Sequence, residues 1–317
     1  MTILGIETSC DETAAAIVED GTKIISNVVA SSAAMHAKYG GIIPDQAARE
    51  QVKSILPVIQ EALVTKIDAI AVTIGPGLIG SLLVGVETAK TLAYAWNKPI
   101  VPINHLVGHI YGNWLETEPP KFPALVLLVS GGHTELILME NHGKYKLLGS
   151  TRDDAAGECF DKCARILNLG YPGGPAIEKN AKSFTRSPLA QQGETFLKLP
   201  RPMINDKNFD FSFSGLKTAV LNRKHENPNH LAYELQEAIS DVLISKTLAA
   251  AKKFTPKSIL LCGGVAANKR LREKIPQAST PDFKFCTDSA AYIASAAFFN
   301  YNPVPWQKIN ADPSLNF

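Results

Sequence analysis

Two histidines stand four residues apart in the segment NHLVGHIYGNW, at His105 and His109. In an α-helix, residues i and i+4 lie one above the other on the same face, so both imidazoles can reach one metal ion. The residues around them are apolar, and a pair of histidines at this spacing also occurs on helix surfaces that bind no ion. The pair by itself therefore allows both interpretations, and a third ligand is needed to decide between them.

Carboxylates that can supply such a ligand gather in three places. Asp11 and Glu12 lie in TSCDET, four acidic residues lie in DDAAGECFDK (153–162), and Asp288 lies in CTDSAAYIA. Asp288 follows a strand-like run and precedes a helical pattern, so one interpretation is a helix N-cap, a position that aspartate favours. The other interpretation is a hard oxygen ligand that completes the pair of histidines.

Four loops of small residues stand at the ends of expected strands: TSCDET (8–13), SGGHT (130–134), YPGGP (171–175) and GGVAAN (263–268). Glycine lets backbone N–H groups approach an anion closely, and hydroxyl groups add donors, so these loops favour phosphate binding. Structural turns without a ligand are the alternative. Neither GxxxxGK[ST] nor GxGxxG occurs, which argues against the two nucleotide-binding plans that those motifs define.

The elements that must position these residues follow a repeated pattern. Residues 1–25 and residues 124–150 both read as strand, loop of small residues, strand, tight turn, strand. Further strands are expected at 67–74 and 258–262, each followed by a glycine-rich turn, and helices at 46–63, 82–96 and 231–254. This alternation predicts an α/β protein with two duplicated lobes.

The amino-acid composition excludes few classes of protein. The 317 residues carry a net charge of +2 and 45% hydrophobic residues, which is typical of a globular protein and gives no overall attraction to nucleic acid or membrane. We see no secretory signal and no apolar run long enough to span a bilayer, so we expect no membrane association and a cytoplasmic location. The five scattered cysteines favour reduced thiols.

Eight segments of the chain together resemble one known family. They are GIETSCDETAAAIV, GPGLIGSLLVG, NHLVGHIYG, LVSGGHTEL, DDAAGECFDK, GYPGGP, FSFSGLKT and GGVAANKRLR. Spread from Ile3 to about Ala297, they are similar to the bacterial branch of the TsaD family, the catalytic subunits of tRNA threonylcarbamoyladenosine synthase, formerly named O-sialoglycoprotein endopeptidases.

The resemblance implies a two-lobed actin and Hsp70-like (ASKHA) fold around a nucleotide cleft. We expect a first lobe of residues 1–104 with 291–317 and a second lobe of residues 105–290. The implied activity is transfer of threonylcarbamoyl from threonylcarbamoyl-AMP to the adenosine 3′ of the anticodon, in tRNAs that read codons beginning with A.

The resemblance also assigns residues. His105, His109 and Asp288 match the family's metal ligands, with iron expected and zinc as the alternative. The positions that match its adenylate-binding residues, for threonylcarbamoyl-AMP or ATP, are Leu128, Val129, Ser130, Gly131, Gly132, Asp161, Gly174 and Asn268. Glu178 is expected to contact the ribose. On chemical grounds, separate from the resemblance, Asp11 and Glu12 are expected to help deprotonate the attacking amine.

The implied partners are tRNA, TsaB-like and TsaE-like proteins, and a TsaC-type enzyme that supplies the adenylate. Two alternatives remain: a nucleotide-gated scaffold without turnover, or a related kinase. A third, the metallopeptidase, lacks the HExxH glutamate, since Leu106 follows His105. The chain also departs from the family pattern at Gln51, where histidine is usual, at Ala48, where serine is common, and at Ser289, where asparagine is common.

Overall fold

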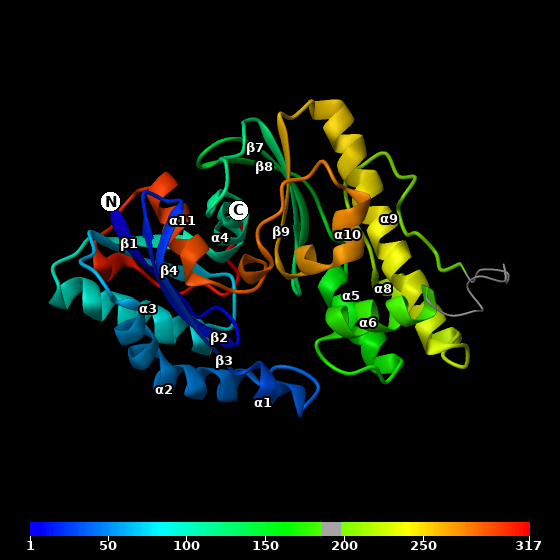
Figure 1. Cartoon of the computed structure of the whole chain (residues 1–317), viewed down its shortest axis with the longest axis horizontal. Coiled ribbons are helices and arrows are strands. Elements are labelled where there is room, and N and C mark those ends of the chain that lie inside the picture. The colour runs from blue at the N-terminus through cyan, green and yellow to red at the C-terminus, as the bar shows by residue number, and fades with distance from the viewer. Residues whose placement is uncertain (186–197) are drawn as a thin grey trace. The chain divides into compact units, whose positions relative to one another are not determined.

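The computed structural model describes residues 1–185 and 198–317 and divides them into two compact units (Figure 1). Unit 1 comprises Met1–Pro120, His142–Lys144 and Pro281–Phe317. Unit 2 comprises Lys121–Asn141 and Tyr145–Thr280. Each unit has its own β-sheet, so each is described by itself.

Unit 1 is built on a five-stranded sheet in the order β3-β2-β1-β4-β5. Its strands are β1 (Thr2–Glu7), β2 (Glu12–Glu19), β3 (Lys23–Ser31), β4 (Ala69–Gly75) and β5 (Ile100–Asn104). The first three are antiparallel neighbours, and β4 and β5 join in parallel. The expected hairpin and the expected strand at 67–74 are therefore confirmed.

Unit 2 repeats this plan with four strands in the order β8-β7-β6-β9. The strands are β6 (Ala124–Val129), β7 (Thr134–Asn141), β8 (Lys144–Ser150) and β9 (Ser258–Cys262). Again the first pairs antiparallel with the second and parallel with the fourth. Ser279 forms a parallel bridge to Leu260 on the free edge of β9, at the place that β5 takes in unit 1. The duplication expected from the sequence is confirmed.

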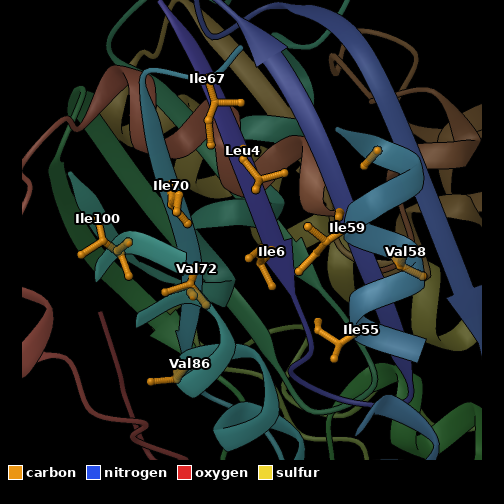
Figure 2. Close-up of a cluster of buried hydrophobic side chains, with 14 of the residues drawn as sticks. Leu4, Ile6, Ile55, Val58, Ile59, Ile67, Ile70, Val72, Val86 and Ile100 are labelled. Carbon is orange, nitrogen blue, oxygen red and sulfur yellow. The ribbon is translucent and has the colours of Figure 1, made fainter. Parts of the chain in front are cut away.

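The helices of unit 1 cover both faces of its sheet. They are α1 (Ala33–Ala37), α2 (Pro44–Ala62), α3 (Ile79–Ala95), α4 (His105–Tyr111) and α11 (Ala290–Phe299). On one face, α2 and α3 pack on a core that includes Leu4, Ile6, Ile59 and Val86 (Figure 2). Full burial of such a side chain stabilises the fold by about 1.5–3 kcal/mol. Because strand side chains alternate, every second residue of β1 points to the opposite face.

That opposite face receives α11. A methyl group at Gly5 of β1 would collide with the carbonyl oxygen of Ala290, so the absence of a side chain lets the start of α11 lie directly on the strand. Gly108 acts in the same way between α4 and α11, because a methyl group there would meet Tyr292 and Ile293. Gly108 thus lets α11 lie close to α4, the helix that carries both histidines, and Gly5 lets it lie close to β1.

Unit 2 has its helices gathered around one long helix. They are α5 (Ala156–Ile166), α6 (Gly173–Thr185), α8 (Ser214–Asn222), α9 (Pro228–Phe254) and α10 (Lys269–Lys274). Asn227 caps α9 by accepting hydrogen bonds from two backbone N–H groups of its first turn. Short 3-10 turns complete the fold at Gly112–Trp114, Gly264–Ala267, Phe283–Phe285 and Trp306–Lys308. Among the described helices, none combines the length and the apolar character needed to cross a bilayer.

The division into units differs from the expected lobes at three points: at two boundaries and at His142–Lys144, which belong to unit 1. The first boundary falls after Pro120 instead of residue 104, and the last segment begins at Pro281 instead of residue 291. The physical reason is that α4 packs on α11 and β5, so α4 and the residues leading into α11 belong with the first sheet. All three expected metal ligands therefore lie in unit 1.

Candidate metal centre and nucleotide-binding loops

The structure brings the two histidines and Asp288 together within unit 1. His105 is the first residue of α4 and His109 follows one turn later, with ring centroids 4.5 Å apart. Asp288 Oδ1 lies 3.7 Å from His105 Nε2 and 3.6 Å from His109 Nε2. One ligand atom from each residue falls within 4.8 Å of the other two.

These distances fit a bound metal ion. Nitrogen and oxygen ligands at roughly 2.1 Å in tetrahedral geometry stand about 3.4 Å apart, which is close to the two distances to Asp288. Asp288 is not the N-cap of α11, because Ser289 takes that position and accepts from Ala291 N. The carboxylate of Asp288 is therefore not used by the helix end and stays directed at the histidines.

The other ring nitrogen of His105, Nδ1, also has polar neighbours. Nδ1 lies 3.1 Å from Glu7 Oε2 and 3.2 Å from Ser9 Oγ. Glu7 is fully buried and accepts hydrogen bonds from Ser9 N and Thr73 Oγ1, each at 2.5 Å. A buried carboxylate at Nδ1 keeps the proton there and leaves the lone pair of Nε2 toward Asp288, an arrangement common among metal-bound histidines.

The electrostatics of the cluster favour a cation. Burial would lower the pKa of His105, but the negative charges of Glu7 and Asp288 raise it to about 9. Burial raises the pKa of Asp288 to about 6 against the attraction of His105. Tyr292 Oη donates to Asp288 Oδ1 at 3.3 Å. A surplus of buried negative charge around two imidazoles is compensated by a proton or by a metal ion.

Asp11, in the loop between β1 and β2, and Glu12, the first residue of β2, both interact electrostatically with Asp288. Burial, followed by the charges of Asp288 and Asp11, raises the pKa of Glu12 to about 9. Ser31 Oγ donates to Glu12 Oε1 at 3.3 Å. Since the charge of Asp288 is felt at Glu12, the structure brings the expected acidic residues and the expected metal ligands into one electrostatic cluster.

In unit 2, the loop Ser130–Gly132 lies where β6 ends, directly after Leu128 and Val129. Ser130 N donates to His133 O at 2.8 Å, and His133 N donates to Ser130 Oγ at 3.0 Å. Methyl groups added at Gly131 or Gly132 would meet nothing within 4 Å. Packing among the described residues therefore does not require glycine at these two positions, and the space beside them is open.

The GGVAAN turn lies beside that loop because β6 and β9 are parallel and their carboxyl ends meet at one edge. Gly263 has a φ of +89°, and a methyl group there would collide with Val129 O. Asn268, further along this turn, is buried: its Oδ1 accepts from Leu271 N and its Nδ2 donates to Gln236 Oε1, both at 3.0 Å. Its side chain therefore anchors the turn.

Three other expected adenylate positions lie around α6. Asp161 Oδ1 accepts from Gly173 N at 2.6 Å and so holds the start of the helix, while Gly174 has open space where its side chain would be. Glu178 pairs with Lys182 at 2.6 Å and accepts from Lys269 N at 3.4 Å. Glu178 lines a cavity of about 340 Å³ together with Ala181, Lys182, Tyr233, Gln236, Lys269, Arg270 and Glu273.

The sequence alone did not point to Glu7, Thr73 or Tyr292 as neighbours of the group formed by His105, His109 and Asp288. A signal was available for Glu7, because a glutamate at the end of the apolar run ILGIE needs a buried partner. No comparable pattern pointed to Thr73, which lies 66 residues further along the chain.

Two α/β units with the same strand order, one of them holding a His-His-Asp group, define an ASKHA-type protein with a candidate metal centre. Solved structures agree on the fold alone. Component A of (R)-2-hydroxyglutaryl-CoA dehydratase from Acidaminococcus fermentans matches with a TM-score of 0.55 at 16% identity, covering 95% of this chain and 98% of that one. Full-length HypF in its phosphate- and nucleotide-bound form matches with 0.60 at 11% identity, covering 94% and 55%.

Sequence comparison gives the family. A family model described as TsaD, tRNA N6-adenosine threonylcarbamoyltransferase, matches residues 23–295. Curated proteins of that name are 51% identical over 316 residues in Dehalococcoides mccartyi strain BAV1, covering 95% of this chain and 94% of that one, and 48% identical over 337 residues in Geobacillus thermodenitrificans, covering 99% and 94%. The chain belongs to the TsaD family, and it is a transferase that modifies tRNA.

Proposed function

We propose that this chain transfers a threonylcarbamoyl group from threonylcarbamoyl-AMP to the exocyclic amine of the adenosine 3′ of the anticodon, in tRNAs that read codons beginning with A. The observation that carries the proposal is the approach of Asp288 Oδ1 to both His105 Nε2 and His109 Nε2, at 3.7 and 3.6 Å. This geometry occurs in a chain that matches the transferase family over residues 23–295.

The three residues would hold one divalent metal ion. Two imidazole nitrogens and one carboxylate oxygen suit iron(II) or zinc, and we propose iron, with zinc as the alternative. When bound with open positions, such an ion supplies Lewis acidity toward a carbonyl or phosphate oxygen. Glu7 and Ser9 would orient His105 for this task through its Nδ1 atom.

Asp11 and Glu12 would accept the proton that the adenosine amine loses as its bond to the carbamoyl carbon forms and AMP leaves. The support is electrostatic: burial and the charges of Asp288 and Asp11 raise the pKa of Glu12 to about 9. A cation near Asp288 would offset part of that charge and bring the pKa of Glu12 toward neutrality, the range in which a general base works well.

Unit 2 would bind the adenylate through its glycine-rich loops. Ser130, Gly131 and Gly132, with Leu128 and Val129 before them, offer backbone and hydroxyl donors, and a side chain added at Gly131 or Gly132 would meet open space. Such open glycines suit an approaching phosphate.

The remaining nucleotide contacts would come from α6 and from the turn before α10. Gly174 also stands beside open space, Asp161 holds the start of α6, and Asn268 anchors the turn. Glu178 would contact the ribose from the side of the cavity of about 340 Å³ that it lines.

Partners follow from the chemistry of this reaction. The acceptor is tRNA, and threonylcarbamoyl-AMP must come from an adenylate-forming enzyme, which we take to be of the TsaC type. TsaB-like and TsaE-like proteins are the proposed assembly partners, on the basis of family resemblance, and a reaction on tRNA fits a cytoplasmic location.

The test is nucleoside mass spectrometry of unmodified tRNA after incubation with this chain, threonylcarbamoyl-AMP and the candidate partners. The expected result is threonylcarbamoyladenosine that disappears when this chain is omitted. If nucleotide binding persisted but no partner combination produced the modified nucleoside, the scaffold alternative would replace the transferase.

A further inference from the structure

Helix α2 carries one amide on its buried face. Gln51 is only 1% exposed, although the residues on either side of it, Glu50 and Val52, reach the surface. The other buried residues of α2 are all apolar: Ala47, Ile55, Val58, Ile59 and Ala62. A buried amide costs free energy unless it is hydrogen-bonded, so its partners explain its presence.

The amide nitrogen of Gln51 faces the backbone of the loop between β1 and β2. Nε2 donates to Cys10 O at 3.0 Å and to Glu12 O at 2.9 Å, and Thr8 O lies further away at 3.5 Å. Two N–H bonds thus meet two carbonyl oxygens. If the amide were flipped, Oε1 would face the same two carbonyl oxygens, and oxygen cannot donate to oxygen. The contacts therefore determine which way the amide of Gln51 points.

The two acceptors are the carbonyls on either side of Asp11. Other elements hold the rest of the loop: Leu78 N donates to Ser9 O at 2.8 Å, Ser81 Oγ donates to Cys10 O at 3.0 Å, and Ser32 Oγ donates to Asp11 O at 2.8 Å. These donors come from the N-cap and first turn of α3 and from Ser32, which directly follows β3. Gln51 adds a link from the loop to α2. Its amide donates both to the residue before Asp11 and to the residue after it.

We propose that Gln51 is a positioning residue: its amide fixes the backbone around Asp11 and so sets the directions of the Asp11 and Glu12 side chains. Its effect on catalysis rests on the proposed function of these two carboxylates. We call the two hydrogen bonds from Gln51 to Cys10 O and Glu12 O the tether. The tether does not depend on that function and can be measured separately.

The loop contains a cysteine, Cys10, whose reactivity reports whether the loop opens. Cys10 is half-buried, whereas the other four cysteines are buried: Cys159, Cys163, Cys262 and Cys286. Local opening of the loop exposes Cys10 alone, while global unfolding exposes all five thiols. The pattern of alkylation among the five cysteines therefore separates a loosened loop from a destabilised protein.

Three variants of the full chain test the proposal. Gln51→Met keeps the length of the side chain and removes both donors, Gln51→His introduces the residue usual in the family with one ring N–H, and Val58→Ala is a control that weakens the same helix face away from the loop. Each is treated with iodoacetamide, and the alkylation rate of each cysteine is followed by peptide mass spectrometry.

We expect Gln51→Met to raise the alkylation rate of Cys10 about tenfold or more, as the loss of two hydrogen bonds allows, with the other four cysteines unchanged. Gln51→His restores part of the protection, and Val58→Ala gives no selective rise at Cys10. In the transfer assay, Gln51→Met lowers kcat with KM and bound metal unchanged.

An unchanged rate at Cys10 in Gln51→Met, or an equal rise at all five cysteines, would overturn the tether. A selective rise at Cys10 with full kcat would overturn the positioning role while leaving the tether intact. If wild-type protein catalysed no transfer at all, the proposed function would fail, and the alkylation pattern would still decide whether Gln51 holds the loop.

Discussion

Glu7 Oε2 lies 3.1 Å from Nδ1 of His105, the ring nitrogen opposite the one that approaches Asp288. The glutamate is fully buried and receives three hydrogen bonds in all. Burial opposes its ionisation, but the charge and hydrogen bond of His105 keep the pKa of Glu7 lowered. Glu7 is thus a fixed anion that selects one tautomer of a candidate metal ligand.

This relationship predicts that Glu7→Gln weakens metal binding although Glu7 is not itself a ligand. We expect a loss of about 10- to 100-fold in affinity, the range typical for partners of metal-bound histidines. The measurement is competition for iron(II) or zinc with a chromophoric chelator. The matched control is Glu87→Gln on the exposed side of α3, which should leave the affinity unchanged. Equal affinities for wild type and Glu7→Gln would contradict the role given to Glu7.

Two glycines of unit 2 distinguish a ligand-binding loop from a structural turn. Side chains added at Gly131 and Gly215 would both meet open space, so neither substitution to alanine should lower stability by more than about 0.5 kcal/mol. We expect Gly131→Ala alone to weaken binding of AMP and ATP, as measured by isothermal titration calorimetry. Unchanged binding of AMP and ATP by the Gly131→Ala protein would mean that the loop is a structural turn without a role in nucleotide binding.

An ion-pair network on α9 gives stability a predictable pH dependence. Lys274 Nζ lies 2.7 Å from Glu237 and 2.6 Å from Asp241, and Arg270 lies 2.6 Å from Glu237. Burial would raise the pKa of both carboxyl groups, but these hydrogen bonds and charges hold each pKa below its ordinary value of 4.5 or 3.8. The stabilisation is therefore complete above those values and is lost as the pH falls through the lowered ones.

Lys274→Met tests this network. We expect a loss of about 1–2 kcal/mol near neutral pH, between the values for surface and buried pairs. The difference from wild type should shrink as the pH falls from about 5 to about 3, because wild type then loses the same pairs. Urea unfolding at several pH values provides the measurement, and Lys53→Met, from an exposed pair with Glu50, is the control. A difference independent of pH would contradict the assignment.

Much of the fold was predictable because it follows local patterns. The Asp-Gly turn at residues 20–21 and the apolar runs on either side of it indicated the first hairpin, and the repetition of this pattern indicated the second sheet. The long helix expected at 231–254 occurs as Pro228–Phe254, since its apolar periodicity is sustained over many turns.

The arrangement of the site was less predictable because it depends on contacts between distant residues. The spacing of His105 and His109 indicated a shared face, but the sequence left Asp288 open between helix cap and ligand. The neighbouring Ser289 takes the cap, which excludes that role for Asp288 and leaves the ligand role as the proposal. The contact of Gln51 with the loop at 8–12 depends on how α2 lies against the sheet, which no local pattern encodes.

The central claim is that transfer depends on a metal ion held by His105, His109 and Asp288. Its most direct test is a paired measurement, on the same preparation, of bound metal and of threonylcarbamoyladenosine formed in tRNA, for wild type and for His109→Ala. Since His109 lies 3.6 Å from Asp288 on the buried side of the cluster, we predict that both quantities fall together. A His109→Ala protein that retained its metal and its transfer activity would contradict the claim.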